Sequence, residues 1–301
     1  MVIRRLLPLF EEFAPERAAD LRAQIAAMAA DVSEGMRSGE NRAITNGLTP
    51  ESSRDPIDSM QGRLDRARTS EERDAIYADI AVALAGKGDP RARELVDKIE
   101  DSELRKKVRS YIDFQSAQSA ISEKNAIEAA RIAKNGELTS IQRVWAFTQA
   151  AKLLMVSDRS RALELLEEAG TEARRIGSSD PDRARALVAV ATGLTQADRV
   201  RAWETIAEAV KAANSAEGFT GDDSRVGAQL QTRSMTVVTG APAEDFNLLG
   251  AFRALAQDDF LRSVETAKSF AGEAPRATAT LAVARSVLDK APQAVQPARG
   301  Q

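Results

Sequence analysis

Paired carboxylates at helical spacing are the residues of this sequence best suited to acid–base or metal chemistry. Glu164 lies four residues before Glu168, and Glu204 lies four residues before Glu208. An offset of four places both carboxylates on one helix face, so two facing helices could hold a metal ion. Carboxylate metal sites of helical bundles, however, also use Glu-x-x-His, and the chain has no histidine. Because basic residues stand three positions away, we interpret both pairs as solvated surface ion pairs.

The residue types that are missing exclude most catalytic machinery. Without cysteine and histidine, the chain cannot build Ser-His-Asp triads, Cys-His dyads, HExxH sites, thiolate metal sites or disulfides. We therefore predict no catalytic residue, no cofactor and no metal ion, and we expect that the protein is not an enzyme. The alternative is an enzyme that uses Asp, Glu, Lys or Tyr alone, with two such groups converging in a cleft. The acidic loop Gly221–Ser224 lacks the EF-hand pattern and is predicted to cap a helix.

Charge and hydropathy exclude two classes of partner. The 42 basic and 45 acidic residues give a net charge of −3 and are interspersed, so no basic stripe for nucleic acid is present. No stretch approaches the roughly 20 apolar residues that a membrane span needs. Pro8 and the acids Glu11 and Glu12 interrupt the N-terminus too early for a signal peptide. We expect a cytoplasmic protein, or an extracytoplasmic one if the chain was cut from a longer precursor.

Aromatic residues in the central part of the chain are the better functional lead. Trp145 and Phe147 lie two positions apart, about 200° around a helix, so both cannot face the same core. We predict that one of them faces a groove that binds a protein or peptide partner. The alternative is that these rings fill gaps between packed helices. The candidate partner-binding groove consists of Tyr77, Arg143, Trp145, Gln149 and Lys152.

Helical periodicity and capping signals predict the elements that position these residues. Helices are expected over residues 57–68, 69–86, 90–99, 101–122, 124–134, 138–155, 159–176, 182–194 and 197–213. The following part is less regular. We expect a helix over 225–238, although Met235–Thr239 favours extended structure, a helix opened by Pro242, and helices over 259–271 and 274–289.

One pattern, Ala-x3-apolar-x2-apolar, returns four times among these helices. Offsets of four and seven form a narrow stripe that lets another helix approach closely. The leading alanines are separated by 34, 36 and 40 residues, an interval typical of stacked helical hairpins. The four stripes are Ala92, Val96, Ile99; Ala126, Ala130, Ala133; Ala162, Leu166, Ala169; and Ala202, Ile206, Ala209.

The last two stripes resemble the second helix of the tetratricopeptide-repeat superfamily of α-solenoids. Ala150 and Ala191, twelve and eleven residues before these stripes, fall where that family's first helix carries a small contact residue. The resemblance covers about half of the chain, and the family's Trp-x2-Leu-Gly-x2-Tyr signature is missing. It implies an all-α array of antiparallel helical hairpins whose concave side binds a protein or peptide.

The sequence thus predicts a non-catalytic helical-repeat scaffold. The alternative function is a sensor that binds a small ligand in a pocket between hairpins, near Trp145 or Trp203. The identity of the partner and the oligomeric state stay open. The expected divisions are an N-terminal helical segment (1–34), a flexible linker (35–56), the repeat array (57–214), less regular C-terminal helical hairpins (215–290) and a disordered tail (291–301).

Overall fold

The structure is a computed structural model that describes residue 57 and residues 60–290. The chain divides into two units, residues 1–59 and 60–301, and the helices and strands below belong to the second. The N-terminal helical segment predicted at 1–34, the linker predicted at 35–56 and the tail predicted at 291–301 lie outside the described residues.

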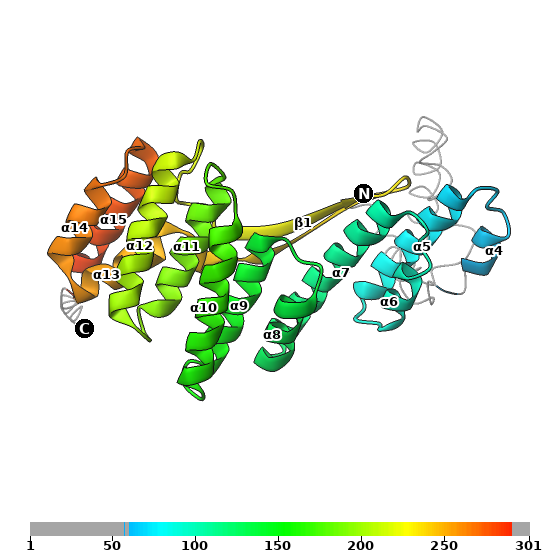
Figure 1. Cartoon of the computed structure of the whole chain (residues 1–301), viewed down its shortest axis with the longest axis horizontal. Helices are drawn as coiled ribbons and strands as arrows, with labels where there is room; N and C mark the ends of the chain where they lie inside the picture. Colours follow the sequence, from blue (N-terminus) through cyan, green and yellow to red (C-terminus); the bar gives the residue numbers. More distant parts are fainter. Residues whose placement is uncertain (1–56, 58–59, 291–301) are drawn as a thin grey trace, which may run out of the picture. The chain divides into compact units, whose positions relative to one another are not determined.

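The described residues are mostly helical, with twelve α-helices and one short 3-10 helix, η3 (Glu244–Phe246). Helices that follow one another in the chain pack side by side in neighbouring pairs (Figure 1), an arrangement compatible with a helical-repeat fold. The helices are α4 (Met60–Leu64), α5 (Ser70–Ala85), α6 (Arg91–Val96), α7 (Ser102–Ser122), α8 (Ala126–Asn135), α9 (Ser140–Leu154), α10 (Arg159–Arg175), α11 (Pro181–Leu194), α12 (Arg199–Ser215), α13 (Leu248–Asp258), α14 (Phe260–Lys268) and α15 (Glu273–Lys290).

Side-chain caps explain why most of these helices begin where they do. Asp101, Asp158 and Asp198 each accept a hydrogen bond from a backbone N–H in the first turn of α7, α10 and α12. Thr139 and Gln142 form a complete capping box at the start of α9. The helices predicted between residues 101 and 213 are confirmed, and their ends agree with the predicted ends to within a few residues.

The alanine stripes form the contacts between helices. All twelve residues of the four stripes are buried, and they belong to α6, α8, α10, α12 and the turn after α6. α11 crosses one stripe closely at Gly193, where a Cβ in place of the glycine hydrogen would lie 2.6 Å from a methyl carbon of Leu166. At this crossing the helices are so close that a residue larger than glycine would require the Leu166 side chain to move.

Ion pairs between alternate helices recur at one sequence interval. Lys134 of α8 pairs with Glu168 of α10 at 3.5 Å, and Arg174 of α10 pairs with Glu208 of α12 at 2.9 Å. Both pairs join residues 34 positions apart, as does a third ion pair between Glu167 and Arg201. These equal intervals are compatible with a helical-repeat fold.

The helix predicted over residues 225–238 is wrong, because this segment forms a β-hairpin. β1 (Arg225–Gln231) pairs antiparallel with β2 (Thr236–Pro242), with Gly227 opposite Gly240 and Gln229 opposite Val238. The β-branched residues near Met235 and the two glycines favour strand over helix. The acidic loop before β1 consequently caps no helix, since Asp223 accepts a hydrogen bond from the N–H of Arg225 in the strand.

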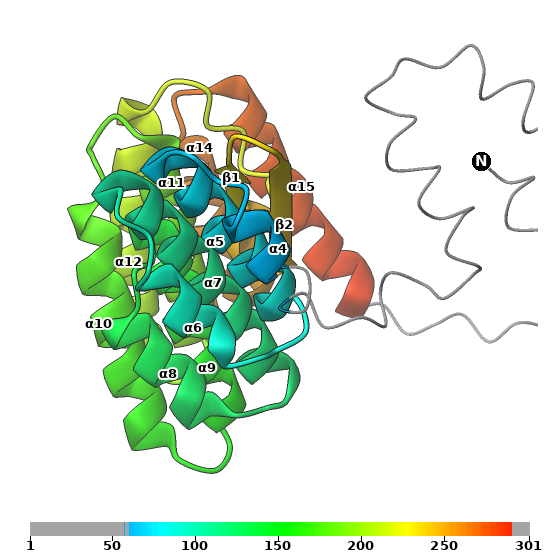
Figure 2. The same cartoon turned by 90° about the vertical axis from the view of Figure 1, so that its right-hand side faces the viewer.

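The hairpin lies along one side of the helices, as Figures 1 and 2 show, and β1 contacts α7 and α9. Val226 and Leu230 of β1 and Ala241 of β2 are buried, while their strand neighbours on the other face are more exposed. At the tip, the hydroxyls of Thr232 and Ser234 donate to Asp79 of α5 at 3.1 and 2.7 Å. The hairpin therefore connects residues of α5, α7 and α9 across the array.

Candidate functional site

Side chains of α9 and α11 bind the main chain of the hairpin. The amide of Gln142 donates to the carbonyl oxygen of Gly227 at 2.9 Å. The guanidinium of Arg185 donates to the backbone carbonyl oxygen of Arg225. The indole N–H of Trp145 donates to the carbonyl oxygen of Pro242 at 3.1 Å. We call the surface of α7, α9 and α11 that contacts residues 223–245 the hairpin-bearing face. Its donors hold an extended chain through carbonyl oxygens, which every residue type provides.

Three of the five predicted groove residues lie together on this face. Trp145, Gln149 and Lys152 are spaced four and three residues apart on α9. Beyond the contact of Trp145 with Pro242, Gln149 donates to the carboxylate of Asp245 at 3.2 Å, and Lys152 pairs with the same carboxylate at 3.1 Å. These side chains contact the chain's own segment after β2, and their binding to a partner stays a prediction.

The other two predicted groove residues lie elsewhere. Arg143 points to the end of α8 and the loop that follows, where its guanidinium donates to backbone carbonyl oxygens that include those of Gly136 and Leu138. Tyr77 lies on α5, half-buried, with the ammonium of Lys98 6.0 Å from its ring centroid. The structure therefore does not bring either of them to the cluster around Trp145.

Trp145 and Phe147 are both buried, although they point to different sides of α9. Trp145 is 3% exposed and packs edge-on against Phe114 of α7, with ring centroids 5.4 Å apart, while Phe147 is 2% exposed. Both can be covered because α9 contacts α7, α8, α10, α11 and β1. Trp145 faces the hairpin, and the prediction that one ring faces a partner-binding groove stays a prediction.

The hairpin-bearing face also contains buried polar atoms whose hydrogen-bonding capacity is unused. Among the described residues, three buried side-chain atoms lack a hydrogen-bond partner: Oε1 of Gln115, Nε2 of Gln118 and Nε of Arg185. Gln118 contacts the hairpin because its Oε1 accepts from the hydroxyl of Thr239, and Gln115 lies one turn before it on α7. Native proteins satisfy most buried polar groups, so these three atoms are exceptions within the chain's own packing, and they are covered rather than open to a partner.

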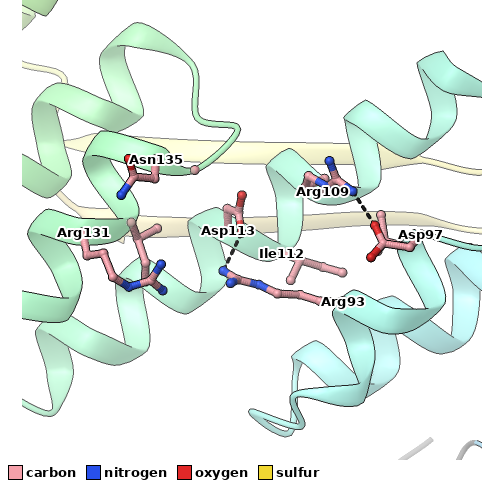
Figure 3. Close-up of a pocket in the computed structure, with 10 residues that line it drawn as sticks. Arg93, Asp97, Arg109, Ile112, Asp113, Arg131 and Asn135 are labelled. Carbon is pink, nitrogen blue, oxygen red and sulfur yellow. Dashed lines mark hydrogen bonds and ion pairs between the residues drawn. The ribbon is translucent and has the colours of Figure 1, made fainter.

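A second candidate is a cavity of about 240 Å³ between α6, α7 and α8 (Figure 3). Arg93 of α6 pairs with the buried Asp113 of α7 at 2.7 Å, and Arg109 pairs with Asp97 at 2.5 Å. Asp113 also accepts a hydrogen bond from the backbone N–H of Glu137 at 2.9 Å. The carboxylate of Asp113 thus fixes the loop after α8 as well as one wall of the cavity.

The charges around this cavity are largely compensated within the chain. Arg131 donates two hydrogen bonds to Glu128, at 2.7 and 2.6 Å. The hydrogen bonds from Arg131 lower the pKa of Glu128, and the same contact raises the pKa of Arg131. Since each arginine here has a carboxylate partner, the cavity presents a balanced ion-pair network rather than an excess of positive charge.

A third hollow, of about 330 Å³, lies beside Trp203 between α12 and α13. The indole N–H of Trp203 donates to Asp258 at 3.2 Å, and Arg199 pairs with the same carboxylate at 2.8 Å. The guanidinium of Arg262 lies 4.4 Å from the centroid of the indole ring. Polar groups therefore converge next to a buried tryptophan, as the small-ligand alternative requires.

Three of the four carboxylates singled out in the sequence, Glu164, Glu168 and Glu208, bind neighbouring cations. Glu164 pairs with Arg161 at 2.6 Å, and the partners of Glu168 and Glu208 are the cations of adjacent helices described above. Within the described residues, no group of three or more acidic side chains is placed to hold a metal ion. None of the helices in this part of the chain combines the length and apolar character needed to cross a membrane.

The segment that sequence reasoning missed is residues 223–245. Asp245, which binds Gln149 and Lys152, and Gly227, whose carbonyl binds Gln142, carried no functional signal of their own. In the sequence of β1, the apolar residues Val226, Ala228 and Leu230 alternate with polar residues or glycine, and this pattern matches the alternation of burial along the strand. That period-two pattern was the signal that could have identified a strand covering the array.

Comparison with known proteins does not assign the site. The chain matches no protein-family description, no curated protein and no solved structure.

Proposed function

We propose that this chain is a non-catalytic helical-repeat scaffold, a tetratricopeptide-like α-solenoid, that binds an extended segment of a protein partner. The buried alanine stripes and the ion pairs at intervals of 34 residues support the repeat. The observation that carries the proposed activity is the hairpin-bearing face. Its side chains bind an extended main chain of the chain itself.

The hairpin in this proposal is part of the binding surface. Hydrogen bonds to carbonyl oxygens recognise the extended conformation rather than one sequence. The exposed ammonium of Lys152 and the carboxylate of Asp245 lie at the end of the hairpin and add charge next to the main-chain donors. A partner that lies beside the hairpin would contact this pair first.

Photo-crosslinking in the source cells tests the proposal. A photoreactive amino acid replaces Lys152, which is 66% exposed at the hairpin-bearing face, or Val156, which is 99% exposed in the turn after α9 and serves as the matched control. The proposal predicts a discrete protein adduct from position 152 that position 156 does not give, and direct binding of that protein to the purified chain. Identical adducts from both positions, or none from position 152, would contradict it.

A second candidate function is a sensor for a small ligand in the hollow beside Trp203. The convergence of Asp258, Arg199 and Arg262 on this indole favours it. In a Trp145→Phe variant, Trp203 is the single tryptophan, so its fluorescence reports on the hollow alone. A saturable change on addition of a polar metabolite pool, lost in Arg199→Ala, would support this function, and an unchanged spectrum would count against it.

A further inference from the structure

The outer strand of the hairpin has an open edge. Backbone hydrogen bonds join Thr232 to Met235 and Ala243 to Ser224 at the two ends of the hairpin. Bonded and non-bonded pairs alternate along an antiparallel ladder, so the backbone groups of Thr236, Val238 and Gly240 point away from β1. Within the described residues, no hydrogen bond reaches these groups.

The two strands differ in what lies beside them. β1 contacts α7 and α9, and the carbonyl oxygens on its outer edge at Arg225 and Gly227 accept hydrogen bonds from α11 and α9. β2 contacts mainly β1, and Val238 is 72% exposed. β2 is therefore an edge strand that presents unpaired main-chain groups and an apolar side chain to solvent.

Between Thr236 and Gly240, this edge lacks most of the features with which proteins block strand pairing. Natural edges are protected by charged side chains, proline or bulges. Residues 234–243 contain no charged side chain, although 29% of the chain is charged, and the pairing has no bulge. Pro242 ends the strand, and the guanidinium of Arg225 in β1 lies beside Gly240. A two-stranded hairpin is marginally stable, and additional strands stabilise it.

We propose that β2 pairs antiparallel with β2 of a second copy of this chain, forming a four-stranded sheet across a two-fold axis at Val238. Of the four outward-facing residues of β2, Pro242 is held by Trp145, and the other three, Thr236, Val238 and Gly240, are spaced two apart and centred on Val238. A two-fold axis there places Val238 opposite the partner's Val238 and Thr236 opposite the partner's Gly240. The strand is thus complementary to itself in register, shape and charge, as an isologous interface requires. This proposal is independent of the proposed scaffold function.

Sedimentation equilibrium on the full chain tests the proposal. We expect a dimer, and a dissociation constant raised by about tenfold or more in Val238→Lys, because two like charges then face each other at the axis. The matched control is Gln229→Lys, which places the same charge on the cross-strand neighbour of Val238, away from the edge; its dissociation constant should be unchanged. A mixture of Val238→Lys and Val238→Asp should dimerise again.

A cysteine variant gives a second measurement that does not depend on the lysine variants folding. The chain has no cysteine, so Val238→Cys should form a disulfide-linked dimer on oxidation, and Gln229→Cys should not. A wild-type chain that is monomeric at every concentration would overturn the proposal. A strand from another protein would then be the alternative partner for the edge of β2. A dimer that Val238→Lys does not weaken would also overturn it.

Discussion

The indole N–H of Trp145 and the carbonyl oxygen of Pro242, which belong to residues 97 positions apart, are joined by a hydrogen bond of 3.1 Å. This contact fixes the end of β2 on α9, and the same indole packs edge-on against Phe114 of α7. One buried side chain therefore links two helices of the array to the hairpin, so its replacement should affect both the packing and the attachment of the hairpin.

Trp145→Phe and Trp145→Ala should separate these two effects. The phenylalanine variant retains an aromatic ring beside Phe114 but loses the N–H donor, and we expect a loss of about 1–2 kcal/mol in the free energy of unfolding. The alanine variant also leaves a cavity, and we expect a loss of about 3–5 kcal/mol. Urea unfolding of both variants measures the difference. Equal losses would mean that the contact with Phe114 contributes little.

Asp113→Asn should destabilise the chain more than Asp97→Asn. Asp113 has a side-chain exposure of 6% and accepts hydrogen bonds from Arg93 and from the N–H of Glu137. Removing its charge should cost about 1.5–3 kcal/mol, the range for hydrogen bonds to charged groups. Asp97 is 66% exposed and pairs with Arg109, so its variant should lose less than about 1 kcal/mol. Thermal or urea unfolding measures both losses. A loss for Asp113→Asn that is no larger than the loss for Asp97→Asn would contradict the burial of Asp113.

Two glycines with positive φ provide a test of packing around Leu248. Gly218 has φ +78° with open space around it, whereas a Cβ on Gly221, at φ +81°, would lie 2.4 Å from a methyl carbon of the buried Leu248. Gly218→Ala should cost about 1 kcal/mol for the backbone conformation alone. Gly221→Ala should cost about 1–3 kcal/mol more because of the steric contact. Equal free energies of unfolding would show that Leu248 moves aside without strain.

Acidification should remove a small part of the stability through Glu128. The hydrogen bonds from Arg131 lower the pKa of Glu128 in the folded chain. A carboxyl group whose folded pKa is depressed adds stability above its unfolded pKa, and this contribution is lost as the pH falls through the folded pKa. Because both side chains are partly exposed, we expect only about 0.2–0.5 kcal/mol. Glu128→Gln should flatten the pH dependence of stability by that amount, and an identical pH profile in both proteins would exclude the effect.

Local signals were sufficient to predict the helices of the central array. Capping residues such as Asp101, Thr139 and Asp158 act within four positions of the residues that they cap, so they are visible in the sequence. The alanine stripes were equally local, and their burial confirms that they are helix contacts. Trp145, Gln149 and Lys152 of the candidate groove lie on one side of α9, and their binding to a partner stays a prediction.

The segment that covers this side of α9 could not be predicted, because it lies far from α9 in the sequence. Pro242 and Asp245 lie more than 90 positions after the α9 residues that they contact. The turn at Thr232–Met235 contains no Asn-Gly or Asp-Gly pair, so the strongest short-range hairpin signal was missing. The surroundings of Arg143 could not be predicted for a related reason, since most of its partners are backbone carbonyl oxygens, which have no mark in the sequence.

Residue-resolved amide hydrogen exchange tests most directly whether the helical array holds the hairpin. The alternating ladder predicts slow exchange for the amides of Val226, Ala228 and Leu230 and fast exchange for Gln229. Gln142→Glu keeps the capping box at Thr139 but removes the donor to Gly227, so it should accelerate exchange of the three protected amides while those of α12 stay unchanged. If these amides exchange rapidly in the wild-type chain, or equally slowly in the variant, the array does not bind the hairpin through its main chain.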